Sequence, residues 1–380
     1  MSVANDVAYF VNSVFGREDA LIVYRQGISL VAAGCEVSYT VFDGKPDEVK
    51  EGIVIHSLGN GLSDAKSRIL KRPKILKAYL RNNPADVYQI SEPELLPLAL
   101  YLKRKGMKVA FNLREWYPDY YARKRKVKWQ QRLVHNICER YFRLVARKID
   151  AVFNCMPEMR DYIEKVMPCR YFEDTANFPV VNKDFSLSYK EYCQREPIIS
   201  YFGSIYTISC QEVIIKALEN FPEVKYLLAG VFYGNNNYKE QLEKMPAWKQ
   251  VTFKNGFTRD ELPGIINCSI MGNVVKDFNK TETPQGSYSI IKIFETMEAA
   301  VPVILAKVPL YEQMVEKYRC GICVEPHSVE DFKNAIEYLL THKKEAYEMG
   351  QNGRRAVIEE FSWDSQAKGY LKVMNALVNE

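Results

Sequence analysis

The sequence predicts an α/β fold in which parallel sheets are covered by helices. Short apolar runs alternate with helical patterns along the chain, and a polar stretch near the middle separates two sets of these units. The 380 residues are enough for two domains with large cores. Because 47% of the residues are hydrophobic and 26% are charged, disordered, collagen-like and disulfide-scaffold classes are excluded.

The first half of the chain contains four predicted strands, at 7–13, 36–42, 108–113 and 150–154. A helix is expected over about 20–33, because Ala20, Leu21, Tyr24, Ile28 and Val31 fall on one face. Gly34 follows and is typical of a helix end.

The second half contains predicted strands at 198–202, 225–230, 269–275, 302–306 and 321–326, each separated by helical stretches. Residues 177–197 are polar, carry proline near both ends and show no clear period, which predicts a linker between two domains. Ligands of open parallel sheets bind at the carboxyl ends of the strands. The sequence therefore places the default active site in a cleft between the domains.

The cysteines indicate a reducing compartment. Their number, nine, is odd, and most lie among apolar neighbours. With no basic start and no small-residue cleavage site at the N-terminus, we expect reduced thiols in the cytosol. The spacing Cys320-Gly-Ile-Cys323 also fits a metal or redox pair, but only His327 is close, so a buried strand is the favoured interpretation.

Several motifs that would define other functions are missing. The sequence has no Walker loop, no GxGxxG after the first strand, no Asp-x-Asp and no GxSxG, and it has only four histidines. Nor does an apolar run approach the roughly 18 residues of a membrane-spanning helix. Triphosphate hydrolysis, NAD binding and triad chemistry therefore lack their usual sequence features.

The most informative stretch is 287–306, which reads as a loop, a helix from about Ile290 and a buried strand from Pro302. A helix N-terminus offers free N–H groups and a positive dipole end, which suit a phosphate. Lys292 and Glu295 share a face one turn in. The ammonium could neutralise a phosphate and the carboxylate could accept both hydroxyls of a ribose. On the residues alone, an ordinary solvated Lys–Glu pair is slightly favoured over this site.

This stretch resembles the signature of family 4 of the retaining GT-B glycosyltransferases, which read roughly K-L-F-E-x-M-A-A-G-x-P-V-I. The resemblance continues through 309–326 and 350–364, and in the first half through 17–37 and 86–118. It implies a GT-B fold, with two Rossmann-like doubly wound domains facing across a cleft. Residues 1–178 would form the acceptor-side domain, on which helix 363–380 packs, and 197–362 the nucleotide-sugar domain.

The resemblance also assigns roles by position. Glu295 matches the family glutamate that binds the donor ribose, and Gly203 matches the glycine after the first strand of the second domain. The remaining donor positions are Tyr288, Ser289, Ile290 and Ile291 at the diphosphate, Gly256 and Phe257 at the base, and Asn273 at a strand end lining the cleft. Gly16 and Glu92 fall on the acceptor side.

The departures from the family pattern concern charge. Ser287 stands where many members have a sugar-binding glutamate, and Ser204 and Ser209 stand where many have diphosphate-binding Arg and Lys. Arg114, followed by Glu115, replaces a family histidine. Because a charge-assisted hydrogen bond contributes roughly 1.5–3 kcal/mol, other cations must compensate. The candidates are Lys292, Arg114, Lys276 and Lys280, and the candidate catalytic residues are Arg114, Glu115 and Lys292.

A basic segment, 123–148, has ten Lys or Arg and one acid, Glu139. From Trp129 onward Leu133, Val134, Ile137, Tyr141, Leu144 and Val145 form a helical stripe. The segment is either a helix docked on the first domain with a solvated basic face, or a surface for an anionic membrane, where each basic residue adds about 1 kcal/mol. Nucleic acid is disfavoured, because no binding module or aromatic platform accompanies the charge.

These features predict an enzyme that transfers a sugar from a nucleotide-diphosphate sugar to a glycan or lipid-linked acceptor with retention. The resemblance implies capsule, O-antigen or exopolysaccharide synthesis, with no metal and no cofactor besides the donor substrate. We expect a cytoplasmic protein, held peripherally on the inner face of the plasma membrane if the basic segment binds lipid. The alternative is an inactive GT-B partner or scaffold, motivated by the three serines, and a weaker one is a sugar-nucleotide epimerase of the same fold.

Overall fold

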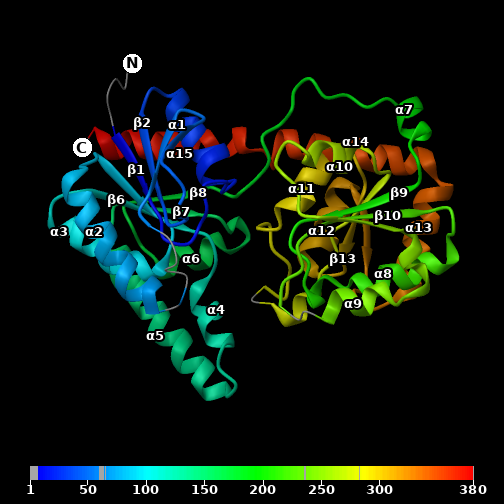
Figure 1. Ribbon diagram of the computed structural model, residues 1–380, viewed down its shortest axis with the longest axis horizontal. Coiled ribbons are helices and arrows are strands. Elements are labelled where there is room, and N and C mark those ends of the chain that lie inside the picture. The colour runs from blue at the N-terminus through cyan, green and yellow to red at the C-terminus, as the bar shows by residue number, and fades with distance from the viewer. Residues whose placement is uncertain (1–6, 60–63, 65, 235–236, 282, 380) are drawn as a thin grey trace. The chain divides into compact units, whose positions relative to one another are not determined.

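The computed structural model describes residues 7–59, 64, 66–234, 237–281 and 283–379. The chain folds into two compact units, each with its own sheet (Figure 1). The first unit comprises the chain up to Asn177 together with the segment from Trp363 onward, and the second comprises Phe178–Ser362.

The first unit is built on an eight-stranded sheet in the order β3-β4-β2-β1-β5-β6-β7-β8. All neighbouring pairs are parallel except β3 with β4. The strands are β1 (Val7–Val11), β2 (Glu36–Val41), β3 (Glu48–Lys50), β4 (Ile53–Ser57), β5 (Val87–Ile90), β6 (Lys108–Leu113), β7 (Ala151–Asn154) and β8 (Tyr171–Asp174).

Helices cover both faces of this sheet, because two separate apolar clusters line it. One cluster joins Leu76, Leu96 and Phe142 to the sheet, and the other joins Leu30 and Tyr370 to it. The helices are α1 (Ile28–Ala32), which continues a π-helical turn (Ile22–Gly27), α2 (Arg72–Asn82), α3 (Leu96–Arg104), α4 (Tyr117–Arg123), α5 (Lys128–Ala146), α6 (Arg160–Val166) and α15 (Trp363–Val378).

The second unit is a six-stranded, all-parallel sheet in the order β11-β10-β9-β12-β13-β14. Its strands are β9 (Ile198–Phe202), β10 (Lys225–Gly230), β11 (Val251–Asn255), β12 (Met271–Asn273), β13 (Val303–Ala306) and β14 (Gly321–Val324). Its helices are α7 (Tyr189–Gln194), α8 (Gln211–Ala217), α9 (Asn237–Glu243), α10 (Leu262–Asn267), α11 (Ile291–Glu298), α12 (Pro309–Tyr318), α13 (Val329–Thr341) and α14 (Lys343–Glu359). Short 3₁₀ turns join several of these elements.

Both sheets reverse their strand order at one point. In the second unit the chain moves from β9 outward to β11 and then returns to place β12 on the other side of β9. In the first unit the same reversal falls between β1 and β5. Ligands of such sheets bind outside the carboxyl ends of the strands at this switch point. Within each unit, the topology therefore directs attention to the residues after β9 and β12, and after β1 and β5.

The predicted α/β class is confirmed, and each of the nine predicted strands is present with its ends shifted by a few residues at most. The stretch 177–197 differs from the expected structureless linker. Residues from Phe178 onward pack with the second unit, and α7 lies within the stretch. A capping box explains this helix, because the Ser188 hydroxyl accepts from the Glu191 N–H while the Glu191 carboxylate accepts from the Ser188 N–H.

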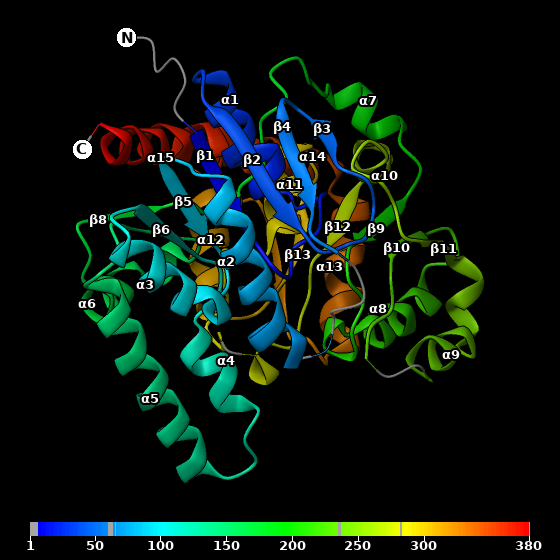
Figure 2. The ribbon, with the colours of Figure 1, turned by 60° about the vertical axis from the view of Figure 1, so that its left-hand side comes forward.

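Helices α4 and α5 form a hairpin that extends away from the first sheet (Figure 2). Only Phe142, Val145 and Ala146, near the C-terminal end of α5, are buried. Among the described residues, no helix is long and apolar enough to cross a membrane.

Candidate functional site

The loop before α11 brings a cation to the switch point of the second unit. Lys292 lies in the first turn of α11, and its ammonium sits 4.0 Å from the centre of the Tyr201 ring at the end of β9. A side chain added at Gly203 would place its Cβ 3.4 Å from Lys292 Nζ. In the described part of the chain, no carboxylate forms an ion pair with Lys292. Its charge is therefore available next to the positive end of α11.

The backbone conformation at position 203 favours glycine. Its φ is +107°, a conformation that residues with a Cβ rarely adopt. The next strand makes the corner tighter, because a Cβ at Gly230 would lie 1.8 Å from the Gly203 carbonyl oxygen. Glycine at 230 thus lets the ends of β9 and β10 approach closely, which a side chain there would prevent.

Glu295 forms the second feature of α11. Its side chain is buried, with 7% of its surface exposed, and Oε1 accepts a hydrogen bond from Arg259 Nη1. Arg259 comes from the loop after β11 that also contains Gly256 and Phe257. A pocket lined by Arg259, Leu262 and Glu295 lies beside this pair. The positions assigned to the ribose and to the base are thus joined by an ion pair that the sequence analysis did not foresee.

Three of the predicted donor residues are engaged within the unit. Ser209 is buried, and its hydroxyl accepts from Tyr201 OH at 3.1 Å and from the Tyr206 N–H. Asn273 is buried and donates to Tyr226 OH at 3.0 Å. The Ser287 hydroxyl accepts from the Ser289 N–H at 3.0 Å, which fixes the turn before α11.

The remaining donor positions lie on loops of the same unit. Ser204 is exposed after β9, and Phe257 is half-buried against Phe202. Tyr288 packs its ring on Phe294 and Phe361. Ser289, Ile290 and Ile291 are half-buried at the start of α11.

The other cations proposed for a phosphate have different partners. Lys280 pairs with Asp277 at 3.0 Å, and Lys276 lies 5.6 Å from the centre of the Phe278 ring. Arg114 belongs to the first unit, where it forms two hydrogen bonds, of 2.8 and 2.9 Å, with the Asp19 carboxylate. Of the four candidates, Lys292 is the one that lies next to Gly203, at the turn after β9 that is called the Gly203 corner below.

In the first unit, Glu92 holds the loop that follows β1. It lies just beyond β5 with 2% of its surface exposed, and its Oε1 accepts from the N–H groups of Ser13 and Val14, both at 2.9 Å. Burial is the main cause that raises the pKa of Glu92 to about 7, while the two N–H groups act in the opposite direction. Glu92 therefore holds the loop after β1 from its buried side, and the loop rather than Glu92 is exposed to solvent.

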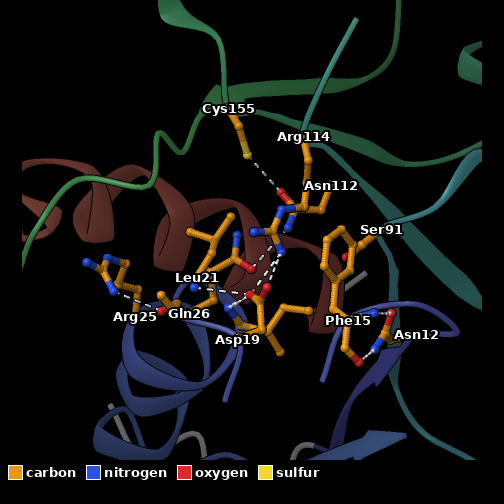
Figure 3. Close-up of polar contacts among 12 residues, drawn as sticks. Asn12, Phe15, Asp19, Leu21, Arg25, Gln26, Ser91, Asn112, Arg114 and Cys155 are labelled. Carbon is orange, nitrogen blue, oxygen red and sulfur yellow. Dashed lines mark hydrogen bonds and ion pairs between the residues drawn. The ribbon is translucent and has the colours of Figure 1, made fainter. Parts of the chain in front are cut away.

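Asn12 and Asp19 complete this loop (Figure 3). Asn12 Oδ1 accepts from the N–H groups of Val14 and Phe15, and Asp19 binds Arg114. The Arg114 guanidinium lies over the Phe15 ring, 4.1 Å from its centre. Gly16 and Glu115 are exposed, and open space surrounds the position of a Cβ at Gly16. These contacts build a rigid loop with an open tip at Gly16.

Sequence reasoning missed Asn12, Asp19 and Arg259. Each is a polar residue just after a strand of the sheet or in the loop that follows one, which is where ligand-binding residues of parallel sheets lie. That position was a usable signal for Asn12. The pairing of Asp19 with Arg114 and of Arg259 with Glu295 joins residues far apart in the chain, so no local spacing could reveal it.

Comparison with known proteins identifies the class of fold to which the two units correspond. Residues 291–356, from α11 into α14, match the family model described as glycosyl transferases group 1. The whole chain superposes on sucrose-phosphate synthase from Thermosynechococcus elongatus with a TM-score of 0.72, 16% identity and 99% coverage of both chains. Anabaena Alr3699/HepE in complex with UDP and glucose gives a TM-score of 0.72 with 13% identity over 98% of this chain and 100% of that one. The fold is therefore GT-B, as the sequence predicted.

Curated relatives match part of the chain. D-inositol 3-phosphate glycosyltransferase of Mycobacteroides abscessus is 25% identical over 184 residues, which are 46% of this chain and 38% of that protein. GDP-mannose-dependent alpha-(1-6)-phosphatidylinositol monomannoside mannosyltransferase of Mycobacterium tuberculosis is 27% identical over 167 residues, 41% of this chain and 42% of that protein. The matched region thus spans about two fifths of the length of these curated relatives.

Proposed function

We propose that the protein is a glycosyltransferase that takes a sugar from a nucleotide-diphosphate sugar and transfers it to a glycan or lipid-linked acceptor with retention of configuration. The observation that carries this proposal is the placement of Lys292 beside Gly203, in the first turn of α11 and at the switch point of the sheet. The names of similar proteins support the substrate class, because they include enzymes of GDP-mannose and a structure with bound UDP and glucose.

In this proposal the second unit binds the donor. The N–H groups of 288–291 and the Lys292 ammonium stabilise the diphosphate as it leaves, because both are fixed before charge develops. Glu295, held in place by Arg259, accepts hydrogen bonds from the ribose hydroxyls. The loop after β11, with Gly256 and Phe257, contacts the base.

The acceptor in this proposal meets the first unit at the Gly16 loop, which Glu92 and Asn12 hold rigid. Retention follows from attack on the face from which the diphosphate departs, with the leaving phosphate taking the acceptor proton. The reaction needs no metal ion. WaaG, a glycosyltransferase involved in lipopolysaccharide biosynthesis, gives a TM-score of 0.67 with 14% identity over 97% of this chain and 99% of that one. That role, and the phosphatidylinositol monomannoside substrate in the name of the mycobacterial relative, support synthesis of a cell-surface glycan.

Ligand-induced stabilisation tests the donor site. UDP, GDP and ADP are titrated separately against the purified chain while thermal unfolding is followed. A diphosphate present at about 100 times its Kd should raise the free energy of unfolding by roughly 2.7 kcal/mol. The matching nucleoside without phosphates is the control and should stabilise far less. If none of the diphosphates shifts unfolding at millimolar concentration, the donor-site assignment is wrong.

An inactive partner or scaffold is the second candidate function, because Ser204 and Ser287 replace charged residues of the family pattern. Binding and catalysis can be separated. An enzyme slowly hydrolyses or transfers the sugar of the diphosphate sugar that it binds, and this release is measured by chromatography of the nucleotide product. Tight binding with no release of diphosphate, with and without acceptor extracts, would favour the scaffold.

We propose an anionic membrane surface as the partner of α5. Most of the stripe on this helix is exposed, whereas one of the two interpretations expected it to dock on the first domain: the exposed fractions are 64% for Trp129, 50% for Leu133 and 57% for Ile137, and only its C-terminal end, at Val145, is buried against the sheet. Exposed apolar side chains next to Arg123–Lys126 and the basic residues of α5 are what an interfacial helix presents to lipid. Such docking would keep the enzyme beside a lipid-linked acceptor.

Vesicles of anionic or neutral lipid test this surface. Of the four tryptophans, Trp129 is 64% exposed, Trp248 in the second unit is half-buried, and Trp116 and Trp363 are each 3% exposed. The fluorescence of Trp129 should therefore shift to the blue, and on anionic vesicles only. The shift should vanish in Trp129→Phe, and binding should fall at 1 M salt, where the Debye length is about 3 Å. Replacing Arg123–Lys126 with serine should abolish binding. Replacing only Arg123 and Lys124 should weaken it, and the exposed lysine pair 343–344 replaced with serine is the control that removes the same two charges elsewhere. Equal binding to neutral vesicles would contradict the proposal.

A further inference from the structure

A cluster of metal-ligand residues lies in the second unit, and none of its members is assigned to the donor. Cys210, Glu212 and His327 each offer one ligand atom, and these atoms lie within 4.8 Å of one another. Cys210 precedes α8, Glu212 is in its first turn, and His327 lies between β14 and α13. The sequence analysis weighed His327 only with the nearby Cys320–Cys323 pair. The fold instead brings it to residues more than a hundred positions earlier.

The histidine is already oriented for coordination. His327 Nε2 lies 3.0 Å from Asp277 Oδ2, and the Asp277 residue has 2% of its surface exposed. Because a carboxylate accepts hydrogen bonds, Nε2 is the nitrogen that faces Asp277, and Nδ1 is the nitrogen left for a metal ion. A carboxylate behind a histidine is the arrangement that fixes the ring and raises its basicity in protein metal sites.

Local charge also suits a cation. The Glu212 and Asp277 carboxylates and the Lys280 ammonium, which pairs with Asp277, leave an excess of one negative charge. A divalent ion bound to the Cys210 thiolate adds one positive charge and cancels this excess. Tyr238 OH donates to Glu212 Oε2 and so orients the carboxylate, leaving Oε1 for an ion.

We propose that Cys210, Glu212 and His327 bind a zinc ion, with Asp277 as the positioning residue for His327 and water as the fourth ligand. Thiolate, imidazole and carboxylate are the zinc ligands of proteins, in tetrahedral sites with bonds of about 2.0–2.3 Å. The thiol proton is released to solvent when the ion binds, because the thiolate is the ligand. Bonds of that length draw the three ligand atoms to within about 3.5 Å of one another.

The ion would fix a functional loop. Cys210 ends the segment that starts at Gly203, and the Asp277 N–H already donates to the Ile208 carbonyl at 2.7 Å. Zinc would therefore clamp the segment after β9 to the segment after β14, and Asp277, through His327, would tie the loop after β12 to the same site. This role is structural, and the inference does not depend on the proposed transferase activity.

Metal titration of the full chain, purified without a polyhistidine tag and stripped with chelator, tests the site. Cobalt(II) replaces zinc as a coloured probe, and one equivalent should produce thiolate-to-cobalt charge-transfer absorption that zinc then abolishes. Cys210→Ser should remove this absorption. His327→Ala should lower the zinc affinity at least about tenfold, and Asp277→Asn, which keeps all three ligands, should lower it roughly 10–100-fold.

Two variants serve as matched controls, Cys193→Ser and His342→Ala, which remove a cysteine and a histidine elsewhere in the same unit. Both should bind cobalt as the unaltered chain does. Because the His327 side chain is 58% exposed, its alanine variant tests the site even if Cys210→Ser fails to fold. Charge-transfer absorption that persists in Cys210→Ser, an affinity unchanged in His327→Ala, or the absence of stoichiometric binding at micromolar metal would each overturn the proposal.

Discussion

Replacing Glu295 with alanine should weaken nucleotide binding without unfolding the protein. The carboxylate is the group that the proposed site offers to the ribose, and it is held at the surface of a pocket by Arg259. Removing it leaves an arginine whose side chain is 37% exposed and can be solvated. Because a partly exposed ion pair contributes at most about 1 kcal/mol, the loss in stability should be small compared with the loss in binding.

The size of the binding defect follows from the hydrogen bonds lost. Bonds to a charged group contribute roughly 1.5–3 kcal/mol, so the Kd should rise by about tenfold to 150-fold. At a concentration where the unaltered chain gains roughly 2.7 kcal/mol of stabilisation, a 100-fold weaker variant sits at its own Kd and gains only about 0.4 kcal/mol. Thermal shifts read at one nucleotide concentration would therefore separate the two proteins clearly.

Isothermal titration calorimetry with the diphosphate that stabilises the unaltered chain gives the Kd directly. Glu316→Ala is the matched control, because this glutamate is exposed on α12 of the same unit. Its Kd should equal that of the unaltered chain. A folded Glu295→Ala protein with unchanged affinity would refute the ribose assignment, even if other residues of α11 prove essential.

Three further outcomes follow from the same structure. Lys292→Met should weaken binding of the diphosphate about tenfold or more while leaving affinity for the nucleoside unchanged; equal losses for both ligands would remove Lys292 from the phosphate. Arg354→Ala should lower the free energy of unfolding by about 3–5 kcal/mol, because Arg354 is 8% exposed, pairs with Glu298 and donates to the Asn182 carbonyl. Arg355→Ala, which removes the exposed neighbouring arginine, is the control, and equal urea midpoints for the two variants would contradict this prediction. Burial raises the pKa of Glu92 from 4.5 to about 7, so the folded chain holds this proton more tightly than the unfolded chain does, and the free energy of unfolding falls as pH rises from 4.5 through 7. Glu92→Gln should remove up to about 3 kcal/mol of that fall between pH 5 and pH 8. Parallel profiles of unfolding free energy against pH for the two proteins would show that Glu92 is not the group concerned.

The sequence was sufficient for most of the strands that are buried on both faces. The run 302–306 is continuously apolar and 108–113 is mostly so, and both form strands in the structure. The strands that were missed are β3, β4, β5, β8 and β11. Three of them, β3, β8 and β11, lie at the edges of the sheets and carry charged residues, whereas β4 and β5 lie inside the first sheet and are too short, at four or five residues, to stand out in the sequence. An edge strand is half-exposed and pairs on one side only, so its composition approaches that of a loop.

The candidate site was predictable only in part, for a different physical reason. Lys292 and Glu295 lie on one helix, so their spacing alone placed them together. What each charge does depends on partners from other segments. Glu295 is bound by Arg259, Arg114 is bound by Asp19, and Lys292 pairs with no carboxylate in the part of the chain that is described. These pairings are set by the order of strands in the sheet rather than by local sequence.

The contrast between Arg114 and Lys292 shows how topology decides which cation can serve a phosphate. Both were candidates to replace the missing family cations. Arg114 already has its charge matched by a bidentate carboxylate, so binding a phosphate there would require Asp19 to give up two hydrogen bonds. Lys292 rests on an aromatic face, an interaction that contributes only about 0.5–2 kcal/mol. A phosphate at the Gly203 corner could therefore recruit Lys292 at little cost, and the chain keeps a usable cation there despite its serines.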